Sequence, residues 1–307
     1  RCKLTGPKCP SSVIVKLPAL DEAAVFTSTM LRMYIREANF FNSLVHEMPI
    51  QVPVGYLSLI DEETSKFVVV MEDLGNMRII DQNIGMTIED ARKSIDAAAK
   101  VHANWWGKGD ALAEAGKTVS LGDPIYPAVL PFVFGEGWAK LTAEMSLPQA
   151  ILEIGPHFSE ALPKLLSSMV VGPNTLCHGD YRADNLLFNE NNEPVAIDFQ
   201  LFCKHTAAYE IAYFVTQSLT PEVASKHERD LFDQWVTALI AHGAQAGLVD
   251  REALWLHYRT AALFCLAYPV IASRGMDLSD PRQRTLIEVM TNRFDRAVRE
   301  LNLAELL

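Results

Sequence analysis

Residues 176–203 constrain the fold of this chain more than any other stretch, because they predict a β-hairpin with oxygen ligands at its open end. Two short apolar runs, residues 186–188 and 195–197, flank a polar connection rich in turn-forming residues. If Leu186 pairs with Ile197, then Asn185 and Asp198 face each other with Cβ atoms about 4.5–5.5 Å apart. The hairpin therefore predicts two oxygen ligands in one small space, which suits Mg²⁺.

The sequence interval between Asp180 and the start of this hairpin points to a catalytic role for Asp180. Four residues separate it from Asn185, and the same interval separates the base from the metal-binding asparagine in kinase catalytic loops. We therefore predict that Asp180 takes the proton from an attacking hydroxyl, while Asn185 and Asp198 hold Mg²⁺ against the phosphates of a nucleotide. Each of these residue types is also common in turns, so the prediction depends on finding all three together.

Several motifs in the chain resemble one known superfamily. HGDYRADNLLF and IDFQ, with REANFF, MEDLG, DQNIG and HANWW upstream, are similar to the aminoglycoside phosphotransferase and choline kinase superfamily, closest to its ecdysteroid-kinase-like branch. The resemblance covers residues 12–219. It implies an α/β (α+β), two-lobed protein-kinase-like fold, with a β-rich nucleotide-binding lobe at residues 1–74 and a helical lobe at residues 75–307. It also implies phosphoryl transfer from ATP, with Mg²⁺, to a hydroxyl of a small molecule.

A lysine and a glutamate in the N-terminal part predict an ion pair. Residues 12–17 read as a strand carrying Lys16, and residues 28–47 read as a helix with Glu37 on its apolar face and Arg36 on its polar face. A carboxylate on an apolar face is costly unless it is paired, so Glu37 needs a cation and Lys16 is the candidate. By resemblance, Lys16 also holds the α- and β-phosphates. The alternatives are an edge-strand lysine and a Glu37 bound to a backbone donor.

The segment after the second predicted hairpin reads as a hinge. Residues 52–60 and 66–72 predict an antiparallel pair, and the apolar run at its end changes abruptly to the polar sequence EDLGN. By resemblance, the Glu72 carbonyl and the Leu74 amide would bond the adenine edge, and Met71 would line the pocket. The alternative is that this segment only ends a strand.

Downstream residues predict a largely helical body. Residues 107–148 follow no regular pattern, and His102 lies on the apolar stripe of a helix, where a hydrogen-bonded core histidine is more common than a ligand. Glu210 stands where the family usually has an aspartate that braces the catalytic loop, which leaves its role open. Helices are predicted at residues 87–106, 205–219, 221–247, 250–273 and 280–303.

Composition excludes some classes of function. A formal net charge of −11 argues against a nucleic-acid partner, which would need a basic face. The longest apolar run, residues 261–272, is too short to span a bilayer, and no signal peptide is visible. Five scattered cysteines without a C-x-x-C pair predict reduced thiols in a cytoplasmic protein without a membrane partner. The sequence gives no indication of oligomeric state.

One element implied by the resemblance is difficult to place. A glycine-rich phosphate loop should lie between two strands before Lys16, yet Gly6 is the single glycine there and no Walker A motif is present. We expect the first strand and the loop to be missing from this sequence or disordered. The alternative is a degenerate nucleotide site.

Three other functions fit the sequence less well. A protein kinase is disfavoured, because IDFQ replaces Asp-Phe-Gly and no Ala-Pro-Glu follows. A pseudokinase acting as a binding module is disfavoured, because no catalytic group is lost. A cationic acceptor such as an aminoglycoside or choline is disfavoured, because the expected acceptor walls contain no carboxylate cluster. Those walls, residues 107–148 and the helices after residue 221, instead carry Trp138, Trp235, Trp255 and Tyr258, which predicts a bulky apolar alcohol.

Overall fold

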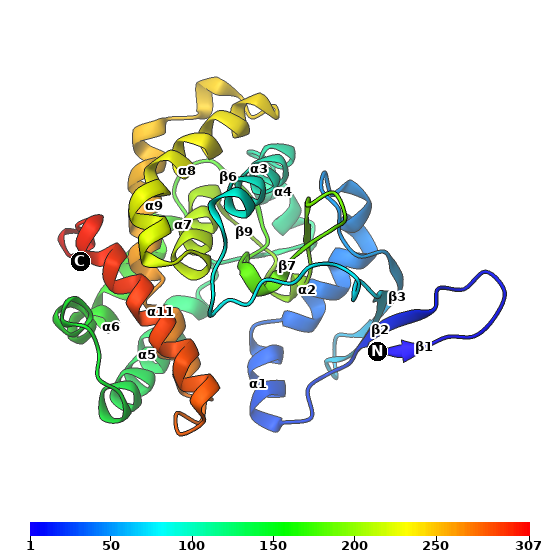
Figure 1. The fold of residues 1–307 in the computed structure, drawn as a ribbon, viewed down its shortest axis with the longest axis horizontal. Helices are drawn as coiled ribbons and strands as arrows, with labels where there is room; N and C mark the ends of the chain where they lie inside the picture. The colour runs from blue at the N-terminus through cyan, green and yellow to red at the C-terminus, as the bar shows by residue number, and fades with distance from the viewer.

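The computed structural model describes residues 1–307, apart from the side chain of Ala23. Figure 1 shows a small sheet and two short helices from the N-terminal part of the chain beside a larger helical body, with strand β7 of the hairpin between them. The mixed α/β class predicted from the sequence is confirmed.

The N-terminal sheet has the strand order β1-β2-β4-β3, with antiparallel neighbours throughout. Its strands are β1 (Cys2–Lys3), β2 (Ser12–Lys16), β3 (Gly55–Asp61) and β4 (Lys66–Glu72). One short strand precedes the strand that carries Lys16, since Cys2 of β1 pairs with Val13 of β2. An exposed loop containing Gly6 joins these two strands and projects from the molecule.

The prediction of a single helix at residues 28–47 is wrong, because the segment forms several short helical pieces. These are α1 (Glu22–Met30), α2 (Met33–Asn39), η1 (Phe40–Leu44) and η2 (Val45–Glu47). The break falls at Arg32, which has a positive φ of 53°, and the Leu31 carbonyl there accepts hydrogen bonds from Arg36. Arg36, expected on a polar face, is therefore buried.

The region predicted to be irregular contains a long helix with an internal proline, and a second long helix with internal prolines follows it. Helix α5 carries Pro131, and α6, which the sequence did not predict, carries Pro156 and Pro163. Together with their neighbours the elements of this region are α3 (Ile88–Asn104), α4 (Gly109–Glu114), β5 (Val119–Ser120), α5 (Ile125–Glu144), α6 (Gln149–Met169) and β6 (Asn174–Cys177).

The C-terminal half begins with the predicted hairpin and continues as helices. The predicted helix at residues 250–273 is divided into α9 and α10. The elements are η3 (Ala183–Asn185), β7 (Leu186–Phe188), β8 (Pro194–Ala196), η4 (Phe199–Leu201), β9 (Cys203–Thr206), α7 (Ala207–Ser218), α8 (Pro221–Ala241), η5 (Ala246–Leu248), α9 (Arg251–Phe264), α10 (Ala267–Ser273), α11 (Pro281–Glu300) and η6 (Leu303–Leu306).

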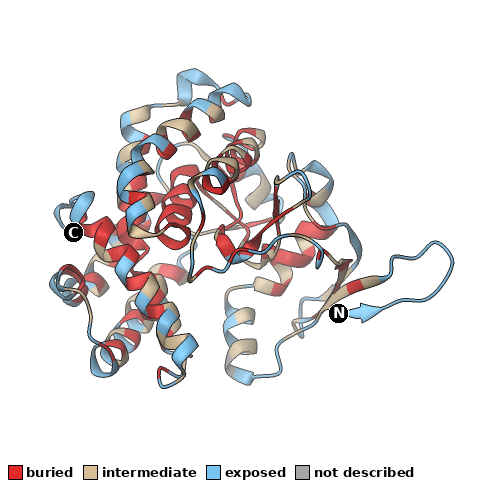
Figure 2. Cartoon of the chain, viewed as in Figure 1, coloured by how far each residue is buried: buried red, intermediate tan, exposed pale blue. Residues whose placement is uncertain are grey.

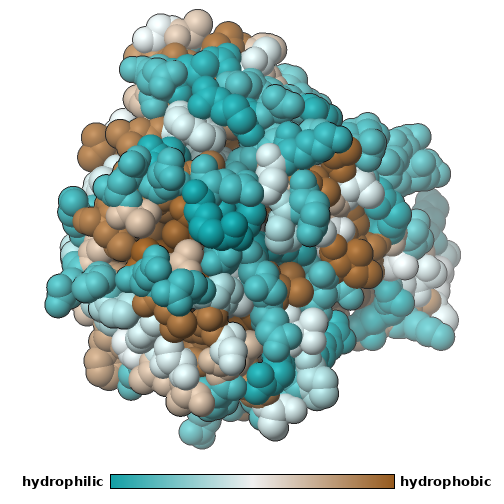
Figure 3. All heavy atoms as spheres, turned by 60° about the vertical axis from the view of Figure 1, so that its left-hand side comes forward, coloured by the Kyte–Doolittle hydropathy of each residue, from teal (hydrophilic) through white to brown (hydrophobic). Residues whose placement is uncertain are grey.

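Helix α7 is the centre of the core. Every one of its residues is buried, and Figure 2 shows that buried residues concentrate around it. On the face drawn in Figure 3, hydrophilic residues predominate and hydrophobic ones form separate patches. Among the helices of the described residues, none has both the length and the apolar character to cross a membrane.

Candidate active site

A cleft of about 360 Å³ brings together all the residues expected to bind the nucleotide. Its volume falls within the range of roughly 300–1,000 Å³ that is common for small-molecule pockets. Asp198 also lines it, whereas Asn185 and Asp180 lie outside its wall. The predicted nucleotide-binding residues in the lining are Lys16, Glu37, Met71, Glu72 and Leu74.

Lys16 is the central charge in this cleft. Its Nζ lies 2.9 Å from Glu37 Oε1 and 2.7 Å from Asp198 Oδ1. Burial disfavours the charged lysine, but the carboxylates of Glu37 and Asp198 together raise the pKa of Lys16 above its ordinary value. Burial raises the pKa of Glu37, an effect that Lys16 partly offsets. The predicted pair of Lys16 and Glu37 is thus present, and Asp198 joins it as a third member.

The hairpin forms as predicted, but its register differs by one residue. Leu186 lies opposite Ala196, and the Ile197 amide donates to the Asn185 carbonyl at 3.0 Å. Asp198 therefore does not face Asn185 directly. It follows Ile197 with a left-handed φ of 65°, a conformation that is strained for a residue other than glycine.

Three donors hold the carboxylate of Asp180, which is nearly buried. Asn185 Nδ2 donates to Oδ2 at 2.8 Å, Arg182 Nε donates to Oδ1 at 3.1 Å, and the Tyr213 hydroxyl donates to Oδ1 at 2.5 Å. Burial and the nearby Asp180 raise the pKa of Tyr213 well above its ordinary value, so this hydroxyl keeps its proton. Because Asn185 Nδ2 donates to Asp180, Asn185 Oδ1 is the atom that remains available as a metal ligand.

Sequence reasoning missed Tyr213, although a signal was available. It lies on α7, one helical turn after Tyr209, in a helix whose residues are all buried in the structure. A buried tyrosine usually needs a partner for its hydroxyl. The preceding motif offers Asp180 as that partner.

His178 and Gly179 fasten this loop to the hairpin. His178 Nε2 lies 2.8 Å from the Ile197 carbonyl, and the Asp180 amide donates to His178 Nδ1. Gly179 has a φ of 81°, and a Cβ there would lie 2.0 Å from the Leu201 carbonyl oxygen. This position therefore requires glycine.

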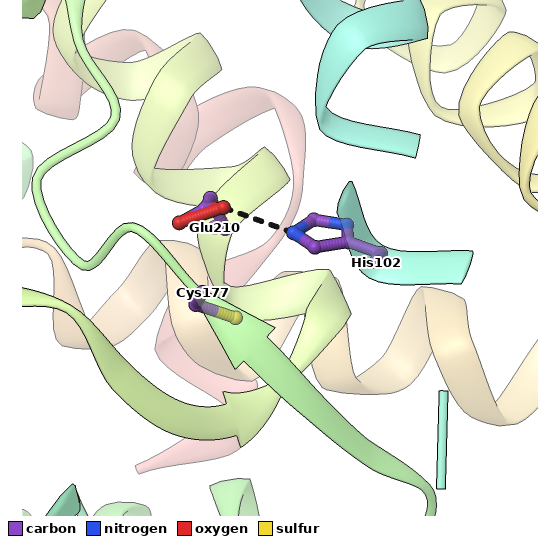
Figure 4. Close-up of side chains that lie close together, drawn as sticks. All are labelled: His102, Cys177 and Glu210. Atoms are coloured by element: carbon purple, nitrogen blue, oxygen red, sulfur yellow. Dashed lines mark hydrogen bonds and ion pairs between the residues drawn. The ribbon is translucent and has the colours of Figure 1, made fainter. Parts of the chain in front are cut away.

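Glu210 braces the catalytic loop from behind. Its Oε1 accepts the Gly179 amide at 3.0 Å, and its Oε2 lies 2.9 Å from His102 Nε2 (Figure 4). The Trp235 indole donates to His102 Nδ1 at 3.1 Å, so a neutral His102 carries its proton on Nε2 and donates it to Glu210. Glu210 therefore braces the catalytic loop at the position where the family usually has an aspartate.

Cys177 completes a cluster with His102 and Glu210, whose ligand atoms lie within 4.8 Å of one another. Metal binding would require a thiolate, but burial raises the pKa of Cys177 well above its ordinary value. Both His102 nitrogens are also committed to hydrogen bonds. The cluster therefore serves as a brace rather than a metal centre.

We expect Glu210→Ala to destabilise the protein. It would leave the buried donors of His102 and Gly179 without an acceptor, and each such donor costs about 1–3 kcal/mol. Urea unfolding would measure the loss, with Glu222→Ala, an exposed carboxylate on α8, as the control. If the two variants were equally stable, Glu210 would not be a brace.

Arg36 ties α2 to two distant elements. The residue is 3% exposed, and its guanidinium donates to the Leu201 carbonyl at 3.1 Å and to the Tyr126 hydroxyl of α5 at 3.2 Å. Leu201 lies beyond Asp198 in the chain and contacts Gly179. The helix that carries Glu37 is thus fixed to the segment that follows the expected metal ligand.

Two of the four aromatic residues expected to wall an acceptor site lie in the core instead. Trp235 and Tyr258 are completely buried in the core. Trp255 stacks on Tyr258, and Trp138 packs tightly against Gly155. The aromatic residue that the structure does place beside Asp180 is Tyr213, whose ring contacts that of Tyr268 on α10.

A sequence model of the phosphotransferase enzyme family matches residues 12–255 of this chain. An uncharacterised protein of Mycoplasma pneumoniae, the MG356 homolog, is 41% identical over 54 residues. That match spans 18% of this chain and 19% of the relative's length.

Several solved structures share the fold. Choline kinase LicA from Streptococcus pneumoniae has a TM-score of 0.54 at 15% identity, covering 95% of this chain and 86% of that one. APH(2")-IIia, in complex with GDP and kanamycin, has a TM-score of 0.58 at 12% identity, covering 92% and 86%. Amicoumacin kinase hAmiN, in complex with AMP-PNP, Ca²⁺ and Ami, has a TM-score of 0.51 at 12% identity, covering 86% and 77%. These likenesses confirm the kinase-like fold.

Proposed function

The chain belongs to the phosphotransferase enzyme family, and from this premise we propose that it is a small-molecule kinase that transfers the γ-phosphoryl group of ATP to a hydroxyl. The observation that carries the proposal is the line of contacts from Glu37 through Lys16 to Asp198 in one cleft. A lysine held between two carboxylates is positioned to bind phosphates. Retention of every catalytic group favours an enzyme over a pseudokinase.

The nucleotide would lie in the 360 Å³ cleft, between residues 1–74 and residues 75–307. Lys16, oriented by Glu37, would hold the α- and β-phosphates. Met71 would line the adenine pocket, and the Glu72 carbonyl and Leu74 amide would bond the adenine edge. The AMP-PNP and GDP named in the structures of hAmiN and APH(2")-IIia support a nucleotide at this place.

The residues beside the cleft fit a hard divalent cation. Asp198 offers a half-exposed carboxylate, and Asn185 keeps an amide oxygen free of its bond to Asp180. Carboxylate and amide oxygens are the ligands that Mg²⁺ accepts together with phosphate oxygens. When bound, Mg²⁺ would neutralise charge on the transferring phosphoryl group. The Ca²⁺ named in the hAmiN structure supports a divalent ion in this fold.

Asp180 would act on the acceptor. Its carboxylate would orient the acceptor hydroxyl and take its proton as the oxygen bonds to the γ-phosphorus and the bond to ADP breaks. Asn185 and Arg182 fix the carboxylate for this task. Most of the rate acceleration would come from this positioning and from charge neutralisation.

We further propose that the acceptor is a bulky alcohol, predominantly apolar, as the ecdysteroid-kinase-like motifs suggest. The choline and kanamycin of the neighbouring structures are cations, and they make a cationic acceptor the alternative. A screen of hydroxylated small molecules with Mg²⁺ and ATP, read by mass spectrometry, tests both proposals. Efficient phosphorylation of kanamycin but not of apolar alcohols would reverse the acceptor choice, and no transfer to any alcohol would overturn the kinase.

Lys16→Ala is expected to lower both activity and stability. Removing one partner of a buried ion pair costs roughly 3–5 kcal/mol, and we expect the lower end because the Lys16 side chain is 27% exposed. Thermal unfolding would measure the effect. The double variant Lys16→Ala/Glu37→Gln should recover stability, because it removes the stranded charge. Equal stability of the single and double variants would show that the pair contributes nothing.

A further inference from the structure

Two glutamines near Asp180 are buried with amide atoms that have no hydrogen-bond partner among the described residues. Gln217 is 0% exposed, and both its Oε1 and its Nε2 are unpartnered. Gln82 is 1% exposed, and its Nε2 is unpartnered. Such atoms are rare in folded proteins, because burying them without a partner is costly. The unpartnered amide atoms of these two glutamines therefore require an explanation.

Gln82 is linked to the proposed base through Arg182. Its Oε1 accepts from Arg182 NH1 at 2.9 Å, and Arg182 Nε donates to Asp180. The Gln82 amide group is therefore two contacts away from the carboxylate that would receive the acceptor proton.

Gln217 is linked to Asp180 by another route, through its helix and its backbone carbonyl. It lies one turn after Tyr213 on α7, so both side chains leave the same face of the helix, and Tyr213 bonds to Asp180. The Arg293 guanidinium also binds the backbone carbonyls of both Gln217 and Gln82. The two glutamines thus belong to one closed ring of contacts around the acceptor side of Asp180.

The charges in this ring balance. The carboxylates of Asp180 and Asp184 face the guanidinium groups of Arg182 and Arg293. Burial lowers the pKa of Arg293 to about 10, so it remains protonated at neutral pH. The ring therefore has no surplus negative charge to offer an ammonium group.

We propose that Gln217 and Gln82 form an acceptor subsite that binds a second, neutral polar group close to the hydroxyl that is phosphorylated. An amide offers both a donor and an acceptor, which matches a second hydroxyl. The acceptor class is then a neutral diol or hydroxy-carbonyl compound rather than an amino alcohol. This inference rests on the proposed kinase function and refines its acceptor.

A buried water molecule is the competing occupant, because ordered waters commonly satisfy buried amides. Water would make the glutamines structural and would give them no influence on the choice of acceptor. The readout must therefore be acceptor selectivity rather than stability alone.

Gln217→Leu tests the inference, because it removes both amide atoms at similar size. Replacing an unpartnered polar group by an apolar one is nearly neutral or stabilising, so we expect the variant to fold. The probes are cyclohexane-1,3-diol, cyclohexanol and 3-aminocyclohexanol, each with Mg²⁺ and ATP. We expect the parent to prefer the diol by about tenfold or more in kcat/KM, the factor that one good hydrogen bond supplies. Gln217→Leu should abolish that preference.

The matched control is Thr216→Val, a buried neighbour on α7 whose hydroxyl donates to carbonyls of its own helix, and it should keep the parent's preference. An unchanged preference in Gln217→Leu, equal use of cyclohexanol and the diol by the parent, or a parent preference for the amino alcohol would overturn the subsite. So would a parent that phosphorylates other alcohols but none of these three. A parent that phosphorylates no alcohol at all would instead overturn the kinase function.

Discussion

Asp180→Asn is expected to lower kcat for phosphoryl transfer by about 10²–10⁴-fold, the usual contribution of a single well-placed base. Affinity for Mg²⁺–ATP should remain nearly unchanged, because Asp180 lies outside the lining of the nucleotide cleft. Asparagine has almost the same size and keeps an oxygen that can accept from Tyr213, so the loop should keep its shape. Product formation by mass spectrometry and calorimetry with AMP-PNP would measure the two quantities.

Asp61→Asn provides the matched control, since Asp61 is an exposed residue at the end of β3, directly before the turn to β4. It should retain the parent's turnover. If Asp180→Asn turned over as fast as this control, the assignment of the base would be abandoned. If it lost nucleotide affinity instead of turnover, Asp180 would belong to the phosphate site.

Asp198→Ala should abolish measurable transfer through a different route. It removes a proposed metal ligand and one of the two carboxylates that hold Lys16, so Mg²⁺-dependent nucleotide binding should weaken together with activity. Calorimetry with AMP-PNP, with and without Mg²⁺, separates these effects. We expect the parent to bind more tightly when Mg²⁺ is present and the variant to lose most of that gain.

Asp73→Ala serves as the control for that experiment, because Asp73 also lines the cleft but bonds to Ser12 rather than to Lys16. It should keep the full Mg²⁺ effect. Identical Mg²⁺-dependence in Asp198→Ala and the parent would place the cation elsewhere.

The local motifs predicted which side chains lie together, because some of these residues need a particular neighbour. Glu37 required a cation, and the structure places Lys16 beside it. The hairpin register was less predictable. Leu186, Leu187 and Phe188 are all buried, so their sequence shows no alternation that would favour one register over the next. The turn decides it, since the Asn189 amide bonds to the Glu193 carbonyl and leaves Phe188 opposite Pro194.

Helices α5 and α6 were harder to predict, because their local sequence argues against a helix. Pro131 in α5 and Pro156 and Pro163 in α6 normally argue against a helix interior, and here tertiary packing overrides that local preference. Phe134 and Phe158, one from each helix, are completely buried against each other. Contacts of this kind between distant segments cannot be read from local pattern. The same limit concealed the buried position of Arg36.

The buried bonds of Arg36 also determine how freely α2 can move. Swinging this helix away from the cleft would break the hydrogen bonds to Leu201 and Tyr126, and bonds from a charged group are worth about 1.5–3 kcal/mol each. Losing two disfavours the displaced state by about 3 kcal/mol or more, which leaves it below about 1% of the population. The ligand-free ensemble is therefore dominated by molecules with Glu37 already on Lys16, and a regulator acting through α2 would have to overcome that free-energy gap.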